Sequence, residues 1–129
     1  MEYGLLGEKL GHSYSKEIHE QLADYTYDLC PVSREDFDAF MTKHDFKAIN
    51  VTIPYKQDVI PYLDAMDDNA ASIGAVNTIV NKNGRLEGHN TDFSGFLYMI
   101  EKHNIRIEGC KCLVPVSYTH LRAHETRRH

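Results

Sequence analysis

Two ionisable side chains in this sequence stand where acid–base chemistry is conceivable. Lys56 falls in the first turn of a helix that Pro54 is expected to begin, because the missing N–H of proline is no loss there. A helix dipole disfavours a cation at that end, so the setting would ease proton loss and suit a general base. The alternative is a solvated surface lysine. Asp92 stands at the expected start of another helix, where capping is by itself the favoured use of a carboxylate.

Five uncharged polar side chains could orient a small ligand beside these two groups. Ser13 and Ser15 offer hydroxyls and free backbone N–H groups at a helix start, a setting that binds an anion such as a carboxylate. The alternative is that one serine caps the helix and the other has no specific role. Asn50 and Thr52 alternate with apolar residues and therefore share one face of an extended segment. Asn77 is either a ligand-binding amide or a turn asparagine.

The periodicity of the chain predicts the elements that would position these groups. Short apolar or β-branched runs predict strands at residues 3–6, 25–29, 48–53, 76–80 and 85–88. Amphipathic stretches predict helices after residue 15 and at residues 33–44, 54–61, 67–73 and 92–103. The order indicates an α/β fold: a three-layer domain with a mostly parallel sheet, one antiparallel strand and helices on both faces. The polar groups fall at the carboxyl ends of strands, where such sheets bind ligands.

Local signals support several of these elements. Ser33 is expected to cap the 33–44 helix, and Asn83-Gly84 predicts a tight hairpin. Asn90 or Thr91 is expected to cap the last helix. Two apolar stripes are expected on helices: one of Tyr14, Ile18 and Leu22, and an inward-facing one of Phe93, Phe96, Leu97 and Ile100.

Composition excludes several classes of protein. The 129 residues are 42% hydrophobic and 26% charged, as in a soluble globular domain. The net charge of -5 argues against general nucleic-acid binding. No stretch is long and apolar enough to cross a membrane, and the N-terminus does not resemble a signal peptide, so a cytoplasmic protein is expected. The three cysteines are expected to be reduced thiols.

Four motifs in order resemble the shikimate dehydrogenase family. The first is a glycine loop that ends in His-Ser-x-Ser, and Ile-His follows it in a helix. The motifs are Gly11-His12-Ser13-Tyr14-Ser15 with Ile18-His19, Asn50-Val51-Thr52-Ile53-Pro54-Tyr55-Lys56, Gly74-Ala75-Val76-Asn77-Thr78 and Gly88-His89-Asn90-Thr91-Asp92. The resemblance covers the chain to about residue 112, which we expect to be the substrate-binding, catalytic domain of such an enzyme.

The resemblance implies reversible, NADPH-dependent reduction of 3-dehydroshikimate to shikimate. It implies that Ser13 and Ser15 hold the substrate carboxylate. It also implies that ring hydroxyls bond to three further residues: Asn50, Thr52 and Asn77. Lys56 would act as the acid–base group, and Asp92 would orient or assist it. The implied partner is this small molecule, with no nucleic acid and no membrane, and a homodimer is left open.

The resemblance ends where a cofactor site should begin. The family continues with a strand and a glycine-rich phosphate loop, but no G-x-G-x-x-G follows the strand-like residues 109–114. We therefore expect no cofactor-binding residues, no bound NADP(H) and no turnover in this fragment. Residues 113–129 are predicted to be an aberrant, disordered tail. His120 and His124 are four apart but lack a third ligand, so no metal site is predicted.

Two alternatives remain at the level of sequence. A quinate or shikimate dehydrogenase that prefers NAD would differ mainly in the missing cofactor loop. A non-catalytic module that senses shikimate could use the same domain. The presence of both Lys56 and Asp92 argues against a sensor, which would not need the pair.

Overall fold

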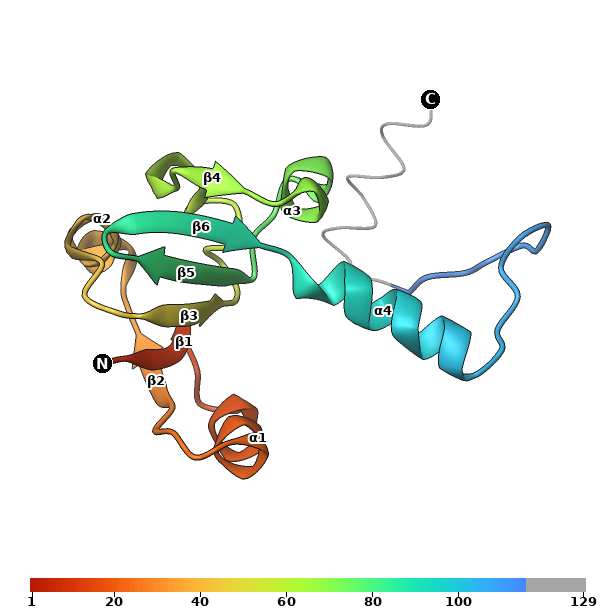
Figure 1. Ribbon diagram of the computed structural model, residues 1–129, viewed down its shortest axis with the longest axis horizontal. Helices are drawn as coiled ribbons and strands as arrows, with labels where there is room; N and C mark the ends of the chain where they lie inside the picture. The colour runs from red at the N-terminus through yellow and green to blue at the C-terminus, as the bar shows by residue number, and fades with distance from the viewer. Residues whose placement is uncertain (116–129) are drawn as a thin grey trace. The chain divides into compact units, whose positions relative to one another are not determined.

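The computed structural model describes residues 1–115. The chain divides into two compact units, Met1–Phe96 and Leu97–His129. Eleven elements are present in the described residues (Figure 1): β1 Tyr3–Gly7, α1 Ser15–Leu22, β2 Asp28–Pro31, α2 Arg34–Lys43, β3 Ala48–Val51, η1 Ile60–Tyr62, β4 Ala65–Met66, α3 Asp68–Ile73, β5 Thr78–Lys82, β6 Arg85–His89 and α4 Thr91–Lys102. Among them, no helix has the length and apolar character needed to cross a bilayer.

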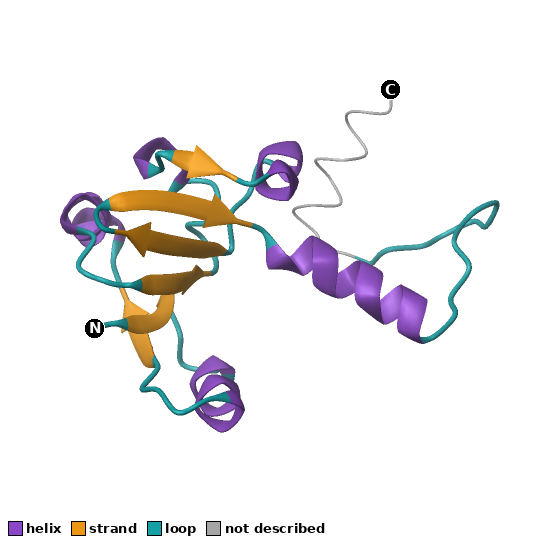
Figure 2. Cartoon of the chain, viewed as in Figure 1, coloured by secondary structure: helices purple, strands orange, loops and turns teal. Residues whose placement is uncertain are grey.

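A six-stranded sheet is the centre of the first unit, with the order β2-β1-β3-β5-β6-β4 (Figure 2). Strand β1 pairs in parallel with β2 and β3, and β4 pairs in parallel with β6. Strand β5 lies antiparallel to both of its neighbours, β3 and β6. The predicted mostly parallel sheet with one antiparallel strand is therefore confirmed.

The two faces of the sheet carry separate apolar clusters. Leu5 and Leu6 are successive residues of β1, so their side chains point to opposite faces. Leu6 belongs to the main core, which includes Phe37 and Met41 of α2 and Ala70 of α3. Helices α2 and α3 therefore cover the Leu6 face.

The Leu5 face carries a smaller cluster of Leu5, Leu10 and Tyr27. Helix α1 covers this cluster, because the His19 ring stacks on the Tyr27 ring with centroids 4.1 Å apart. Helices thus lie on both faces, and the predicted three-layer α/β class is confirmed.

The two strongest local signals are confirmed. Ser33 caps α2, since its hydroxyl oxygen accepts from Asp36 N at 3.3 Å. Asn83 and Gly84 join β5 to β6 with φ of 54° and 91°, the left-handed conformation that a tight hairpin turn needs. Asn90, rather than Thr91, caps α4, because its Oδ1 accepts from Asp92 N at 3.0 Å.

The predicted helix at residues 54–61 is wrong. Residues 54–59 form turns, and only the short 3-10 helix η1 follows. The Ile53–Pro54 peptide bond is cis, a geometry that the helix prediction did not include. Lys56 therefore lies in a turn, and the helix-dipole argument for its reactivity does not hold. Strand β4 was not predicted, and β2 begins three residues later than residue 25.

The predicted apolar stripes are largely in solvent. The stripe of α1 is 72%, 54% and 77% exposed at Tyr14, Ile18 and Leu22. The polar side of α1 faces the sheet instead: Lys16 Nζ donates to Tyr27 O at 2.7 Å, and Glu20 Oε1 accepts from Tyr27 N at 3.2 Å. In α4, Phe93 and Phe96 are 43% and 53% exposed and Leu97 is 41% exposed, whereas Ile100 is buried.

The described part of the second unit consists of the end of α4 and a chain of turns. Ile105 N donates to Ile100 O at 3.0 Å, and Asn104 and Gly109 adopt positive φ. Residues 109–115 contain no strand, so the strand suggested at 109–114 is not formed. Residues 116–129, including His120 and His124, lie outside the described residues.

Candidate functional site

The serine loop runs from the carboxyl end of β1 to the start of α1. Gly7 closes β1 in a crowded position, where an added Cβ would lie 2.8 Å from Thr52 Cγ2. Only glycine lets the loop approach Thr52 this closely. Ser13 Oγ accepts from Ser15 N at 3.2 Å, which leaves the Ser13 hydroxyl proton free to be donated to a ligand. Ser15 is the first residue of α1, whose N-terminus favours an anion.

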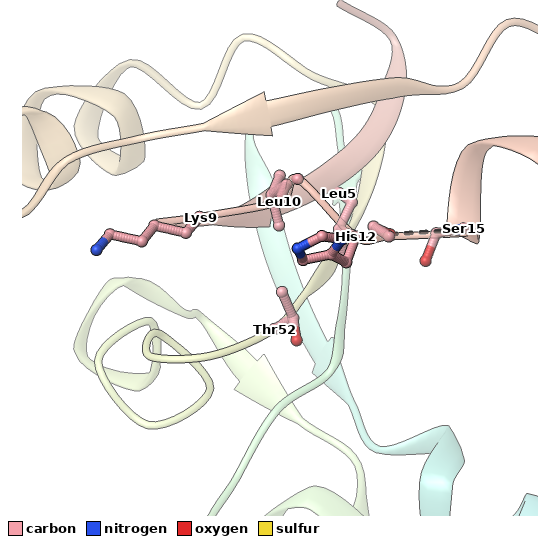
Figure 3. Close-up of a pocket in the computed structure, with 8 residues that line it drawn as sticks. Leu5, Lys9, Leu10, His12, Ser15 and Thr52 are labelled. Carbon is pink, nitrogen blue, oxygen red and sulfur yellow. Dashed lines mark hydrogen bonds between the residues drawn. The ribbon is translucent and has the colours of Figure 1, made fainter.

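A cavity of about 400 Å³ lies against this loop. Three of the predicted ligand-binding residues line it: Ser13, Ser15 and Thr52. The His12 ring lies over Thr52, with Ser15 on the α1 side, and Lys9 extends away from Ser15 (Figure 3). Apolar Leu5 and Leu10 complete much of the wall. Hydroxyl donors, an imidazole and an apolar wall suit a small ligand with both polar and carbon surfaces.

A chain of hydrogen bonds runs along the Leu5 face of the sheet. Asn50 Oδ1 accepts from Tyr27 Oη at 2.7 Å, and Asn50 Nδ2 donates to Thr78 Oγ1 at 3.1 Å. Thr78 Oγ1 donates to Asn77 Oδ1 at 3.1 Å, and Asn77 Nδ2 donates to Thr91 Oγ1 at 2.8 Å. Burial raises the pKa of the Tyr27 hydroxyl, which therefore stays protonated and able to donate.

This series of side-chain hydrogen bonds ends beside an ion pair. Lys56 Nζ lies 3.0 Å from Asp92 Oδ2, and Asp92 directly follows Thr91. Both side chains are open to solvent, with 36% of Lys56 and 63% of Asp92 exposed. A pair this exposed contributes little to stability, but it holds a proton donor and a carboxylate where a ligand can reach them. The short distance between Lys56 and Asp92, and not a helix dipole, is therefore the reason to place Lys56 at the site.

All seven predicted residues fall into three connected groups. Ser13, Ser15 and Thr52 line the cavity; Asn50 and Asn77 belong to the hydrogen-bonded chain; Lys56 and Asp92 form the ion pair. Asn50 is the register partner of Leu5, which lines the cavity, so the first two groups adjoin. Val76 N donates to Lys56 O at 2.8 Å, which brings the ion pair next to the second group.

Sequence reasoning missed three residues at the site. Tyr27 and Thr78 bond to the predicted amides, and the His12 ring lines the cavity. Thr78 stands directly opposite Asn50 in the β3–β5 register, a pairing that only the hairpin register would have indicated. A second cavity of about 440 Å³ shares Lys9 and Thr52 with the first and is further lined by Glu8, Ile53 and Pro54.

Comparison with known proteins gives consistent matches. The family model for the shikimate dehydrogenase substrate binding domain matches residues 5–79. A shikimate dehydrogenase (NADP(+)) of Clostridium perfringens is 44% identical over 116 residues, which are 83% of this chain and 42% of that protein. The chain thus spans less than half the length of this relative.

Two solved structures are similar to the chain. Shikimate dehydrogenase 1 from Peptoclostridium difficile is 37% identical, with a TM-score of 0.75 over 84% of this chain and 44% of that one. A shikimate 5-dehydrogenase from Thermus thermophilus, in complex with NADP(H) and shikimate, is 31% identical. Its TM-score is 0.73 over 82% of this chain and 43% of that one.

Proposed function

Because the chain belongs to the shikimate dehydrogenase substrate binding domain family, we propose that residues 1–112 are the substrate-binding part of an NADP-dependent shikimate dehydrogenase. The reaction is the reversible reduction of 3-dehydroshikimate to shikimate. One observation carries the proposal: Lys56 and Asp92, 36 positions apart in the sequence, have their charged atoms 3.0 Å from each other. The four motifs resemble the family in their residues and in their order, and this contact adds the spatial relation that the chemistry requires.

The carboxylate of the substrate would lie against the serine loop. The Ser13 hydroxyl proton is free, because its oxygen already accepts from Ser15 N. Ser15 adds a second hydroxyl at the α1 N-terminus, where the aligned backbone dipoles favour negative charge. Thr52, in the same cavity, is in position for a ring hydroxyl.

The proton of the reaction would be handled by Lys56. In the direction of reduction, the carbonyl oxygen becomes a hydroxyl oxygen and takes up one proton, which the Lys56 ammonium can donate. In the reverse direction, the neutral Lys56 amine receives that proton from the substrate hydroxyl. Asp92 accepts a hydrogen bond from Lys56 Nζ and holds the amine in place between the two states.

We propose no site for the nicotinamide cofactor within residues 1–115. NADP(H) would need a glycine-rich turn between a strand and a helix, and residues 109–115 contain no strand. The matched segment is less than half of each relative named above, and the Thermus thermophilus structure is in complex with NADP(H). We therefore assign no residue of the chain to the cofactor.

Shikimate should bind weakly but saturably to the chain, as measured by isothermal titration. Ser13→Ala and Ser15→Ala should each weaken binding by about tenfold or more, the usual effect of losing one hydrogen bond to a charged group. Ser72→Ala, which removes an exposed serine of α3, is the matched control and should leave the affinity unchanged. The uncharged methyl ester should bind the wild type no better than shikimate binds the serine variants. Equal affinity of acid and ester would contradict the proposed carboxylate site.

Mixing the chain with NADPH and 3-dehydroshikimate should give no oxidation of NADPH above background. Lys56 is the proposed proton donor, but the reaction also needs a hydride donor held beside the substrate, for which we propose no residue within residues 1–115. Absorbance at the nicotinamide band measures this directly. Sustained turnover by the purified chain would show that the cofactor site has been misassigned.

A further inference from the structure

We propose that Thr78 is a positioning residue, whose hydroxyl couples the Asn50 side-chain amide to the Asn77 side-chain amide and so fixes the direction in which Asn50 turns its oxygen and nitrogen. The inference rests on the proposed function only for the identity of the ligand. The orientation itself follows from the hydrogen bonds.

The orientation of Asn77 is set by the backbone N–H of Thr91, which can only donate. It lies 2.9 Å from Asn77 Oδ1, so this corner of the Asn77 amide must be the oxygen. The other corner is then the nitrogen, which donates to Thr91 Oγ1 at 2.8 Å. The start of α4 therefore sets the orientation of Asn77.

Thr78 transmits the orientation of Asn77 to Asn50. Thr78 Oγ1 lies 3.1 Å from Asn77 Oδ1, an atom that can only accept, so the single Thr78 hydroxyl proton is donated there. Thr78 Oγ1 can then only accept from Asn50, at 3.1 Å, and Asn50 must turn its nitrogen toward Thr78. Asn50 Oδ1 consequently faces Tyr27, whose hydroxyl donates to it at 2.7 Å.

Thr78 is held at this junction by the sheet. It stands opposite Asn50 on β3 and opposite His89 on β6, and Asn77 precedes it in the chain. With its hydrogen bonds running in one direction, each bond polarises the next. A valine in its place would keep the side-chain shape and the β propensity, but it would remove the hydrogen bonds through which Thr78 connects the two amides.

The orientation decides what each amide can offer a ligand. Both hydrogens of Asn50 Nδ2 point to acceptors in the protein, Thr78 Oγ1 at 3.1 Å and Asn77 O at 3.5 Å. Asn77 Nδ2 has one hydrogen bond, to Thr91, so one N–H remains. Asn77 therefore keeps one N–H that could be donated to an oxygen of the substrate, whereas both hydrogens of Asn50 Nδ2 are used within the hydrogen-bonded chain.

The experiment compares Thr78→Val, which lacks the hydroxyl, with Thr78→Ser, which keeps it. Side-chain amide signals of Asn50 and Asn77 are followed by 15N NMR in the free chain, with Asn50→Asp and Asn77→Asp used to assign them. Thr78→Val should shift both sets of signals and weaken shikimate binding by about tenfold, the effect of losing one hydrogen bond. Thr78→Ser should leave the signals near their wild-type positions and the affinity within about threefold of wild type.

The outcomes separate this inference from the proposed function. Unchanged amide signals in Thr78→Val would overturn the role of Thr78, whether or not shikimate binds. Shifted signals without any shikimate binding to the wild type would support the role of Thr78 and count against the proposed ligand. Should Thr78→Val not fold, hydrogen exchange in the wild type decides: Asn50 amide protons that exchange as fast as those of a free asparagine would contradict the hydrogen-bonded chain.

Discussion

Replacing Lys56 with alanine should lower kcat by about 10² to 10⁴ in a fusion of residues 1–112 with the remaining part of a relative such as the Clostridium perfringens enzyme. This range is the usual contribution of a positioned acid–base group. The substrate would keep its contacts with Ser13, Ser15 and Thr52, so KM should change much less than kcat. Steady-state oxidation of NADPH with 3-dehydroshikimate measures both constants.

Two further lysine variants make this result specific. Lys47→Ala removes another exposed lysine, which pairs with Glu2 at 2.8 Å, and should leave kcat unchanged. Lys56→Arg keeps the charge beside Asp92 but cannot release its proton at ordinary pH, so it should be nearly as slow as Lys56→Ala. An arginine variant with close to wild-type kcat would mean that Lys56 acts only through its charge.

The residue types at the site could be predicted from sequence, but their contacts could not. Asn50 and Thr52 were placed on one face by alternation, and the structure puts Asn50 in the hydrogen-bonded chain and Thr52 in the cavity. The bond between Asn50 and Thr78 depends on the register of β3 against β5, which local patterns do not specify. The Lys56–Asp92 contact joins the turn after β3 to the first turn of α4, and no periodicity of the sequence predicts that these two segments meet.

Elements with strong local signals were predicted well, and those that depend on tertiary contacts were not. Helix α2 has its own cap and apolar stripe, and the β5–β6 hairpin has its own turn residues. The segment after Pro54 has a good helix-starting residue but forms turns, and the Tyr55 side chain in these turns is buried in the core, a tertiary contact that local patterns do not report. Helix α1 shows the same limit: its apolar stripe predicted burial, but polar contacts with Tyr27 turn the other side toward the sheet.

Tyr55 is the residue that ties the turn carrying Lys56 to the core. Its side chain is fully buried, its ring stacks on Phe37 with centroids 4.3 Å apart, and its hydroxyl donates to Val32 O at 2.6 Å. Burial raises the pKa of this hydroxyl, so it remains a hydrogen-bond donor at ordinary pH. The motif therefore alternates roles at neighbouring positions, with Tyr55 inward as an anchor and Lys56 outward toward Asp92.

Tyr55→Ala should lower the free energy of unfolding by about 3–5 kcal/mol, as loss of a buried aromatic ring does elsewhere. Tyr55→Phe keeps the ring and should cost only about 1–3 kcal/mol, because it leaves the Val32 carbonyl without its donor. Urea unfolding followed by circular dichroism measures both values, with Tyr14→Ala, at a tyrosine 72% exposed, as the control within about 0.5 kcal/mol of wild type. If Tyr55→Ala were as stable as Tyr14→Ala, the turn would be held by other contacts, and the position of Lys56 would need another explanation.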